Sequence, residues 1–404
     1  MIFNKGQLRA INDAVNWFGN SSEQVFEIAG NPGTGKSVVI NEILNRIQNK
    51  YNIKSHRIAP MAYTGAASIV MRLKGLYTAR TIHSSLYEAV EAPLIGEDGK
   101  IIMDTYLNVP VTGLKFVPKQ LKGKLDIIVI DEGGTVPLSM RNILLNTGAK
   151  ILVAGDVDQL PPVADTPAFL TNYDKVHILD EIMRQAEGSA IIYLSQRAKS
   201  GLPIHTGWYS SDVLVIEEDQ VTDGMLLSSP VILCGRNNTR DKINDHIRFN
   251  IKGYKDPLPK YLEKIICRKN NWGLECDGIN LTNGLTGTII NSPDPSDFDG
   301  REFRIDFVPD MLPSAVFYNV PVSYPYISAN RNQKDMIKKT GFVSGNLFEY
   351  GYSQTVHLAQ GSQWPQGMYY EEYLNREINN RVHYTALTRF SNRCIYVKQR
   401  RKYY

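Results

Sequence analysis

Short runs of aliphatic and β-branched residues recur along the first half of the chain, and each run ends at polar or glycine positions. Residues 24–29, 125–130 and 149–154 are such runs, and residues 57–60 form a shorter one. Their length and residue types favour buried strands of a parallel sheet. Residues 38–47 instead carry apolar side chains at helical spacing. Strands that alternate with helices predict an α/β fold.

The pattern changes in the second half of the chain. Residues 231–234 are a further strand candidate, and a helix is predicted at 238–248. From about Tyr261, short β-type runs are separated by clusters of Asn, Gly, Asp and Pro, which predicts an all-β insertion. These runs are 265–267, 286–290 and 303–307. No strand can be assigned between 310 and 330, whereas 393–397 predicts a final strand before a basic tail.

The stretch between the first predicted strand and the first predicted helix fits the phosphate-binding pattern GxxxxGK[ST] at every fixed position. It consists of Gly30, Asn31, Pro32, Gly33, Thr34, Gly35, Lys36 and Ser37. Its glycines let successive backbone N–H groups and a helix N-terminus face a β-phosphate. Lys36 would reach the β- and γ-phosphates, and the Ser37 hydroxyl would bind Mg²⁺. A chance glycine-rich turn is the alternative, which the flanking strand and helix disfavour.

Polar groups that could meet the same nucleotide follow the next two buried strands. Asp131 could hold Mg²⁺, and Glu132 could orient or deprotonate an attacking water. An acidic turn after a strand is the structural alternative. In the segment 155–163, Gln159 could hydrogen-bond the γ-phosphate or the water, because ligands meet the carboxyl ends of parallel strands.

Composition narrows the class of protein without identifying a partner. With 404 residues, 43% of them hydrophobic and 21% charged, the chain is long enough for two or three packed domains. A net charge of +4 permits a polyanionic partner but does not demonstrate one. No run is long enough for a membrane span, and no signal peptide is recognisable. The four cysteines form no CxxC pair, so we expect reduced thiols and a cytoplasmic protein.

The ordered set of motifs resembles that of the superfamily 1B DNA helicases, in particular the RecD-like and Dda-like branch, over nearly the full chain. Residues 30–37 match motif I, Asp131 and Glu132 match motif II, and 155–163 match motif III. Six further segments resemble the remaining motifs of the family. They are Lys5-Gly6-Gln7, Thr64-Gly65-Ala66-Ala67, Thr81-Ile82-His83-Ser84, residues 181–185, residues 353–364 and residues 384–389.

The resemblance implies ATP and Mg²⁺ at the site and a role for each matching residue. Gln7 would read the adenine, Gly361 would belong to the nucleotide site, and Arg184 and Arg389 would stabilise the transferring phosphoryl group. An interlobe ion pair is the alternative for either arginine. The implied contacts to single-stranded DNA are Thr64, His83, Thr355 and His357, with Tyr63, Tyr87 and Trp364 as weaker stacking candidates, for which burial is the alternative.

Two positions depart from the family pattern. Leu358-Ala359 stands where motif V usually has Lys-Ser, and Gly133-Gly134 follows motif II where small or apolar residues are common. A basic run is a further feature that could contact DNA phosphates, although most such runs are solvated faces. It consists of Arg331, Lys334, Lys338 and Lys339.

The resemblance also implies an architecture of two RecA-like parallel-sheet lobes with an inserted β-hairpin pin and a small SH3-like β-barrel. The first lobe would be 1–190, with the hairpin at about 88–120. The second lobe would be 191–260 and 346–404, with the barrel at 261–345, leaving no room for another domain within these residues. An Asp98-Gly99 turn within 91–103 is the hairpin signal, and a plain surface hairpin is the alternative.

The implied activity is ATP hydrolysis coupled to unwinding of forked duplex DNA, with 5′-to-3′ movement on single-stranded DNA, in replication, recombination or repair. A monomer is expected, with replication or recombination proteins as partners, in the cytoplasm of a bacterium or a phage-infected host. An RNA helicase, or a translocase that displaces proteins without unwinding, stays open because contacts to the 2′-OH cannot be read from sequence. A nucleotide-gated binding module is disfavoured by intact Lys36, Asp131 and Glu132, and a nucleotide kinase by the late motifs.

Overall fold

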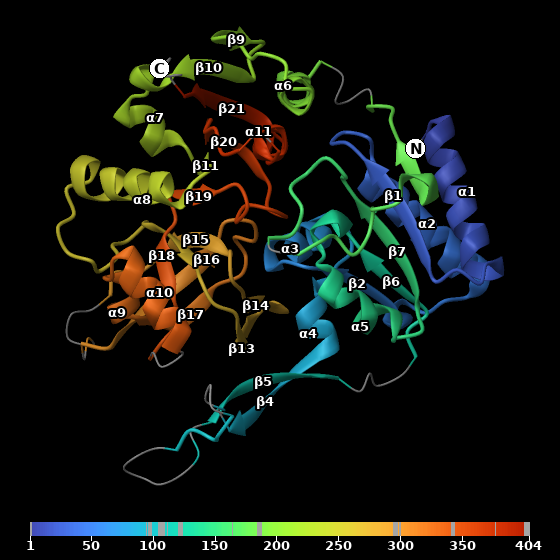
Figure 1. Cartoon of the computed structure of the whole chain (residues 1–404), viewed down its shortest axis with the longest axis horizontal. Coiled ribbons are helices and arrows are strands. Elements are labelled where there is room, and N and C mark those ends of the chain that lie inside the picture. Colours follow the sequence, from blue (N-terminus) through green and yellow to red (C-terminus); the bar gives the residue numbers. More distant parts are fainter. Residues whose placement is uncertain are drawn as a thin grey trace.

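Six parallel strands form the sheet of the first lobe in this computed structural model (Figure 1). Their order across the sheet is β3-β2-β6-β7-β1-β8. The strands are β1 (Val25–Gly30), β2 (Ile58–Ala62), β3 (Arg80–Thr81), β6 (Ile127–Ile130), β7 (Lys150–Gly155) and β8 (Val176–Leu179). The four runs predicted as strands in the first half of the chain are thereby confirmed.

The structure describes residues 2–93, 95, 99–103, 110, 112–119, 124–163, 165–183, 188–293, 298, 300–340, 344–375 and 377–399. No helix within those ranges is both long enough and apolar enough to span a membrane. The cysteines, all of which lie in those ranges, are free thiols.

The first sheet is buried on both faces, which explains its continuous aliphatic runs. Ile28, Val129 and Leu152 belong to a core formed with the two long helices of one face. Ile128 and Ile151 belong to the core on the opposite face, with the shorter helices. The long helices are α1 (Lys5–Asn20) and α2 (Lys36–Tyr51), and the shorter ones are α4 (Ile82–Leu86) and α5 (Arg141–Leu145).

A second six-stranded sheet forms the second lobe, in the order β19-β11-β20-β21-β10-β9. All of its pairings are parallel except that of β9 with β10. The strands are β9 (Gly207–Tyr209), β10 (Val213–Glu217), β11 (Ile232–Cys234), β19 (Ser353–Thr355), β20 (Trp364–Tyr370) and β21 (Phe390–Lys398). Separate cores on its two faces include α6 (Ala190–Lys199) with α11 (Asn379–Leu387), and α7 (Asp223–Ser228) with α8 (Asn237–Asp245).

The insertion in the second lobe is an antiparallel sheet of order β17-β16-β15-β12-β18. Asn346 joins its two edges, because it donates to Pro321 O at 2.7 Å and accepts from Ser323 N at 3.0 Å. The SH3-like description stays a prediction. The strands are β12 (Lys264–Cys267), β15 (Thr286–Ile289), β16 (Glu302–Pro309), β17 (Phe317–Ser323) and β18 (Phe348–Tyr350), with a separate arm made of β13 (Asn271–Cys276) and β14 (Ile279–Leu281).

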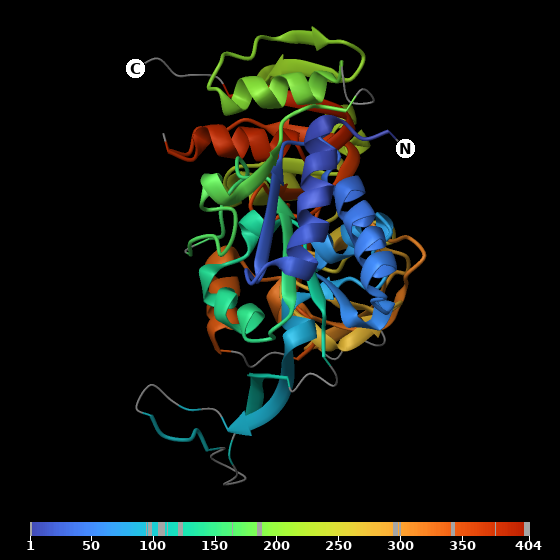
Figure 2. The same cartoon turned by 90° about the vertical axis from the view of Figure 1, so that its right-hand side faces the viewer.

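A long hairpin projects from the first lobe, away from both sheets in two perpendicular views (Figures 1 and 2). Its paired strands are β4 (Tyr87–Pro93) and β5 (Thr112–Pro118). The turn predicted at Asp98-Gly99 accounts for only part of this hairpin. A β-bridge joins Ile95 to Ile101 on either side of that turn, and Asp98 itself lies outside the described residues. The domain boundaries themselves stay predictions.

The basic run of the insertion lies on α10 (Arg331–Thr340), where it faces the protein's own carboxylates. Arg331 Nη1 lies 3.1 Å from Asp241 Oδ2, and Lys338 Nζ lies 4.0 Å from Glu349 Oε1. Lys334 and Lys338 also lie over the ring of Tyr326. These three side chains thus have acidic or aromatic partners within the protein, and the expectation that the run contacts DNA phosphates stays a prediction. The side chain of Lys339 is not described.

A fully buried ion pair connects the second lobe to the insertion. Arg248 Nε lies 3.2 Å from Glu263 Oε1, and neither side chain is exposed. The guanidinium also donates to two backbone carbonyls, and Tyr352 Oη donates to Glu263 Oε1 at 2.8 Å. Removing one partner of such a pair leaves a charge buried without compensation.

The variant Glu263→Gln is therefore expected to lower the free energy of unfolding by about 3–5 kcal/mol, measured by urea denaturation. Its control is Glu42→Gln, which removes the surface pair with Arg46 and should cost no more than about 0.5 kcal/mol. Equal stability of the two variants would contradict the assigned role of the buried pair.

Candidate active site

The phosphate-binding loop connects β1 to α2 and depends on its glycines. Gly33 and Gly35 have φ angles of 83° and 80°, which L-residues rarely adopt. A Cβ on Gly30 would lie 2.5 Å from Thr34 Oγ1. Lys36 Nζ donates to Gly30 O at 2.5 Å and to Asn31 O at 3.2 Å. The loop therefore curls around the lysine at the start of a 16-residue helix whose first N–H groups have no helical partner.

A cavity of about 990 Å³ lies between this loop and the second lobe. Asn31, Pro32, Gly33, Gly35, Lys36 and Ser37 line it together with Asp131, Glu132 and Gln159. The second lobe contributes Gly361, Ser362, Gln363, Thr388 and Arg389. Gln7, Gly30 and Thr34 lie buried beneath that lining. Most of the predicted nucleotide residues thus meet in one cavity, although they come from segments that are more than 350 positions apart in the chain.

Asp131 lies at the end of β6 and is nearly buried. Burial raises the pKa of its carboxyl group, and Lys74 and Lys36 counteract that rise. No cluster of three or more acidic, His or Cys side chains that could hold a metal occurs among the described residues. Mg²⁺ commonly takes one or two carboxylates and completes its shell with phosphate oxygens and water. Ser37 and Asp131 fit such a site, because both line the cavity that would hold the phosphates.

Arg389 reaches the cavity from the second lobe and is 4% exposed. Its Nη1 lies 3.5 Å from Glu132 Oε1 and donates to Ser362 O at 3.2 Å, while Nε donates to Thr385 O at 3.2 Å. The arginine and the acid expected to act on water are thus already neighbours across the two lobes. Arg184, the other predicted arginine, lies outside the described residues.

Gln159 is 7% exposed and has a carbonyl oxygen without a partner among the described residues. Its Nε2 lies 3.5 Å from Asp156 Oδ2. A buried amide oxygen normally has a hydrogen-bond partner. Because Gln159 also lines the cavity, a nucleotide or an attacking water could supply the missing donor.

The predicted DNA contacts lie on both lobes. Thr64 caps α3 (Gly65–Leu73) by accepting from Ala67 N at 3.2 Å, and a Cβ on Gly361 would lie 2.6 Å from its hydroxyl. Thr355, at the end of β19, is 8% exposed. Trp364 is buried in the core of the second lobe, so the expectation that it stacks on a base is wrong.

His83 and His357 are half-buried, and burial lowers the pKa of each imidazole. Both are therefore neutral at pH 7 and would meet DNA as hydrogen-bonding groups without positive charge. The His83 ring lies between those of Tyr63 and Tyr87, at centroid distances of 6.0 and 5.7 Å. Burial alone does not exclude these two tyrosines from a stacking role, since both are partly accessible.

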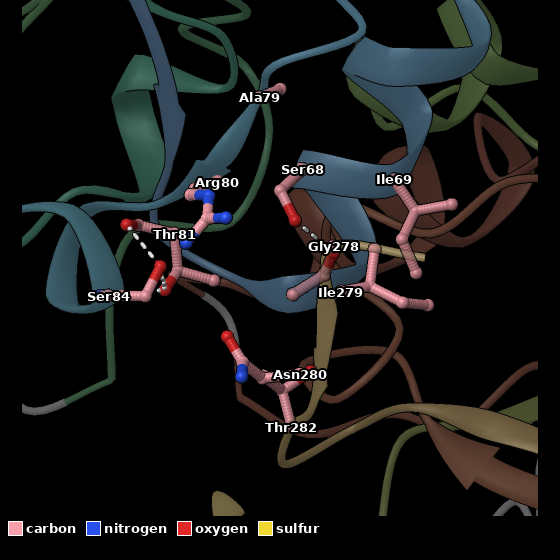
Figure 3. Close-up of a pocket in the computed structure, with 11 residues that line it drawn as sticks. Ser68, Ile69, Ala79, Arg80, Thr81, Ser84, Gly278, Ile279, Asn280 and Thr282 are labelled. Atoms are coloured by element: carbon pink, nitrogen blue, oxygen red, sulfur yellow. Dashed lines mark hydrogen bonds between the residues drawn. The ribbon is translucent and has the colours of Figure 1, made fainter. Parts of the chain in front are cut away.

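The arm of the insertion, β13 and β14, packs on the first lobe beside Thr81 and Ser84, next to the predicted DNA contact His83 (Figure 3). Thr81 and Ser84 of the first lobe and Asn280 of the arm line one small pocket there. Arg72 donates to Asp277 O and to Gly278 O, both at 2.7 Å. The arm therefore connects the insertion of the second lobe to helix α3 of the first.

A family model described as an AAA domain matches residues 3–220, which is more than half of the chain. The chain belongs to the AAA domain family. Among curated relatives, the ATP-dependent RecD2 DNA helicase of Deinococcus radiodurans is 24% identical over 295 residues, 66% of this chain and 36% of that protein. The chain spans well under half of the length of the curated relatives it matches.

Solved structures agree on the fold. The Bacteroides Pif1 helicase in complex with ADP-AlF3 and single-stranded DNA superposes with a TM-score of 0.54 at 14% identity, over 98% of this chain and 92% of that chain. A Pif1 structure that concerns unwinding at forked duplex DNA gives a TM-score of 0.55 at 14% identity, with the same coverage. This AAA-family chain has the fold of Pif1/RecD-like superfamily 1 helicases, which confirms the predicted pair of RecA-like lobes.

The two departures from the helicase motifs have structural explanations. A Cβ on Gly133 would lie 2.2 Å from Val153 Cγ1, so the close approach of this turn to β7 requires glycine. Leu358 packs beside the insertion, where a Cβ on Gly284 would lie 3.6 Å from its Cδ1. This AAA-family chain thus makes an apolar contact at the motif V position where the superfamily 1B helicases usually have lysine.

Sequence reasoning missed two groups of this site. Lys74 lines the cavity and counteracts the rise that burial causes in the pKa of the Asp131 carboxyl group. Tyr384 is fully buried, and its hydroxyl lies within hydrogen-bonding distance of both Asp156 and Asn31. Tyr384 stands inside motif VI, which was the one signal that could have found it. Lys74 follows a helix with no local signal.

Gln7 is held by the protein on both sides of its amide. Its Oε1 accepts from Asn4 N at 3.1 Å, while Nε2 donates to Thr34 O at 2.9 Å and contacts Met183 Sδ at 3.1 Å. We expect Gln7→Ala to raise KM for ATP about tenfold, because the loop loses an anchor worth about one net hydrogen bond. Steady-state hydrolysis at varied ATP concentration measures this.

Asn4→Ala separates this effect from simple loss of the helix cap. Asn4 accepts from Gln7 N at 2.7 Å, forms the capping box of α1 and lines the same cavity, but no bond among the described residues joins it to the phosphate-binding loop. An equal rise of KM in both variants would attribute the effect to the start of α1 and not to the bond between Gln7 and the loop.

Proposed function

We propose that the protein is an ATP-dependent DNA helicase that moves 5′ to 3′ on single-stranded DNA and unwinds the duplex ahead of it. The observation that carries this proposal is the single cavity lined by the phosphate-binding loop of one lobe and Arg389 of the other. Hydrolysis in such a cavity depends on closure of the lobes. Because predicted DNA contacts lie on both lobes, closure also moves one set of contacts relative to the other.

The similarities favour a motor over other users of a phosphate-binding loop. The Deinococcus relative is named an ATP-dependent DNA helicase, and the Pif1 structures concern single-stranded and forked DNA. We also propose that the projecting β4–β5 hairpin acts as the pin that separates the two strands at a fork. We further propose a cytoplasmic monomer that works in replication, recombination or repair with proteins of those processes.

The side chains of the cavity would supply the roles that in-line hydrolysis needs. Lys36 would exchange the carbonyls of Gly30 and Asn31 for phosphate oxygens. Glu132 would orient the attacking water and accept its proton while the water oxygen bonds to the γ-phosphorus and the bond to the β-phosphate oxygen breaks. Arg389 would turn from Glu132 to the transferring phosphoryl group. Ser37 and Asp131 would hold Mg²⁺, which supplies charge neutralisation at the phosphates when bound.

The test combines ATP hydrolysis with strand displacement. We expect single-stranded DNA to stimulate hydrolysis, and a duplex with a 5′ single-stranded tail to be unwound while the same duplex with a 3′ tail is not. Matched RNA substrates complete the set. Hydrolysis that ignores DNA would overturn the proposal, stimulation by RNA alone would indicate an RNA helicase, and stimulation without displacement would indicate a translocase that does not unwind.

A further inference from the structure

The segment from Asp156 to Leu160 follows a strand of the first sheet but is bonded to the second lobe. Leu160 N donates to Thr385 Oγ1 at 3.0 Å, and Leu160 O accepts from Gln360 Nε2 at 2.6 Å. Lys199 forms an ion pair with Asp158. Gln159 lies between these attachment points, so its position depends on the second lobe as much as on the strand that precedes it.

Tyr384 of α11 adds a bond that reaches the phosphate-binding loop as well. Its hydroxyl donates to Asp156 Oδ2 at 2.6 Å, and Asn31 Oδ1 lies 3.3 Å away. Burial raises the pKa of the phenol, so the hydroxyl keeps its proton. A phenol has only one hydrogen to donate. The two acceptors, one from the phosphate-binding loop and one from the Gln159 segment, therefore compete for it.

Each acceptor is connected to a group expected to act on the nucleotide. Asn31 lines the cavity, and its backbone carbonyl accepts from Lys36 Nζ, the group that phosphates would draw away. Asp156 Oδ2 also lies 3.5 Å from Gln159 Nε2. A change at Lys36 can thus reach Gln159 through residue Asn31, whose backbone carbonyl contacts Lys36 and whose side-chain Oδ1 contacts the hydroxyl of the opposite lobe.

We infer that Tyr384 is a positioning residue that transmits the state of the phosphate-binding loop to Gln159 by sharing its hydroxyl hydrogen between Asn31 and Asp156. The inference rests on the proposed hydrolytic function. It adds a second connection between the lobes, made by a tyrosine hydroxyl, to the one made by Arg389. A purely structural buried tyrosine is available for comparison. Tyr369 Oη contacts His383 at 2.6 Å within the second lobe and is equally buried.

The variant Tyr384→Phe removes only the hydroxyl, and Tyr369→Phe is its matched control. Binding of Mg²⁺-ADP and of Mg²⁺-ADP with aluminium fluoride is measured with the wild type and both variants. We expect Tyr384→Phe to bind ADP as the wild type does but ADP-aluminium fluoride about tenfold more weakly, as loss of one hydrogen bond to a charged group predicts. The kcat of Tyr384→Phe should fall about tenfold with KM nearly unchanged. Tyr369→Phe should change neither the two nucleotide affinities nor kcat.

Coupling between the residues is tested with Asn31→Ala and Asp156→Asn, alone and combined with Tyr384→Phe. Non-additive losses of ADP-aluminium fluoride affinity support the shared hydrogen, because neighbours in one network do not act independently. Equal weakening of both nucleotides, additive losses, or a matching effect of Tyr369→Phe would each overturn the inference. A wild type that binds the nucleotides but ignores DNA overturns only the helicase proposal, so the two failures are distinguishable.

Discussion

Arg389→Ala is expected to lower kcat for ATP hydrolysis by about 10³- to 10⁵-fold, the range measured for arginines that stabilise phosphoryl transfer. Arg389 is the described arginine that lines the cavity from the second lobe, and its Nη1 already lies 3.5 Å from Glu132 Oε1. Its charge would face the γ-phosphoryl oxygens when negative charge spreads over them. Single-turnover hydrolysis with saturating ATP and single-stranded DNA measures the loss.

Two further variants separate chemistry from folding. Arg389→Lys keeps the charge but loses the planar fork that bonds Glu132, Ser362 and Thr385 together, so it should retain only a small part of the activity. Arg393→Ala removes an exposed arginine from β21, four residues away along the chain, and should leave kcat unchanged. A wild-type kcat in Arg389→Ala would remove this residue from the proposed mechanism.

Lys36→Ala is expected to reduce hydrolysis by at least about 10³-fold and to weaken the binding of ATP more than that of ADP. The Lys36 ammonium lies within the phosphate-binding loop and, in the described part of the chain, donates to the carbonyls of Gly30 and Asn31. Alanine at this position removes the one positive charge that the loop itself supplies. Equilibrium binding of labelled ATP and ADP, together with steady-state hydrolysis, measures both effects.

Lys50→Ala is the matched control for Lys36→Ala, because Lys50 is exposed near the other end of the same helix. It should change neither nucleotide binding nor hydrolysis. DNA-stimulated hydrolysis that survives in Lys36→Ala would assign the ATPase activity to some other site, or to a contaminating enzyme.

The phosphate-binding loop and the acidic pair were predictable because their chemistry demands a local pattern. Gly33 and Gly35 supply backbone angles that other residues avoid, and Asp131 ends a strand that had to be buried on both faces. The ordered motifs resembled those of a helicase family, and that resemblance implied the two RecA-like lobes. The relation between distant motifs such as Arg389 and Glu132 needed the resemblance to a family, since nothing local connects them.

Features that depend on tertiary neighbours could not be predicted. The basic run on α10 had the composition of a DNA-binding face, but Asp241 and Glu349, which neutralise it, lie in other elements. Trp364 stood in a DNA-contacting motif, yet its strand β20 pairs with β21 and places the indole in the core. The two hydrogen-bond acceptors of Tyr384, on Asn31 and Asp156, belong to the opposite lobe, so the sequence around Tyr384 carries no sign of them.

The Arg72 contact has an energetic consequence for how far the lobes can separate. Arg72 belongs to the first lobe, whereas the arm to which it donates hydrogen bonds belongs to the insertion of the second lobe. Withdrawing the arm breaks two hydrogen bonds from a charged donor, each of which contributes about 1.5–3 kcal/mol. Wide opening of the cleft would have to break these bonds, as well as the ion pair between Arg80 of the first lobe and Glu275 of the arm. Arg72 therefore adds to the free-energy cost of separating the lobes.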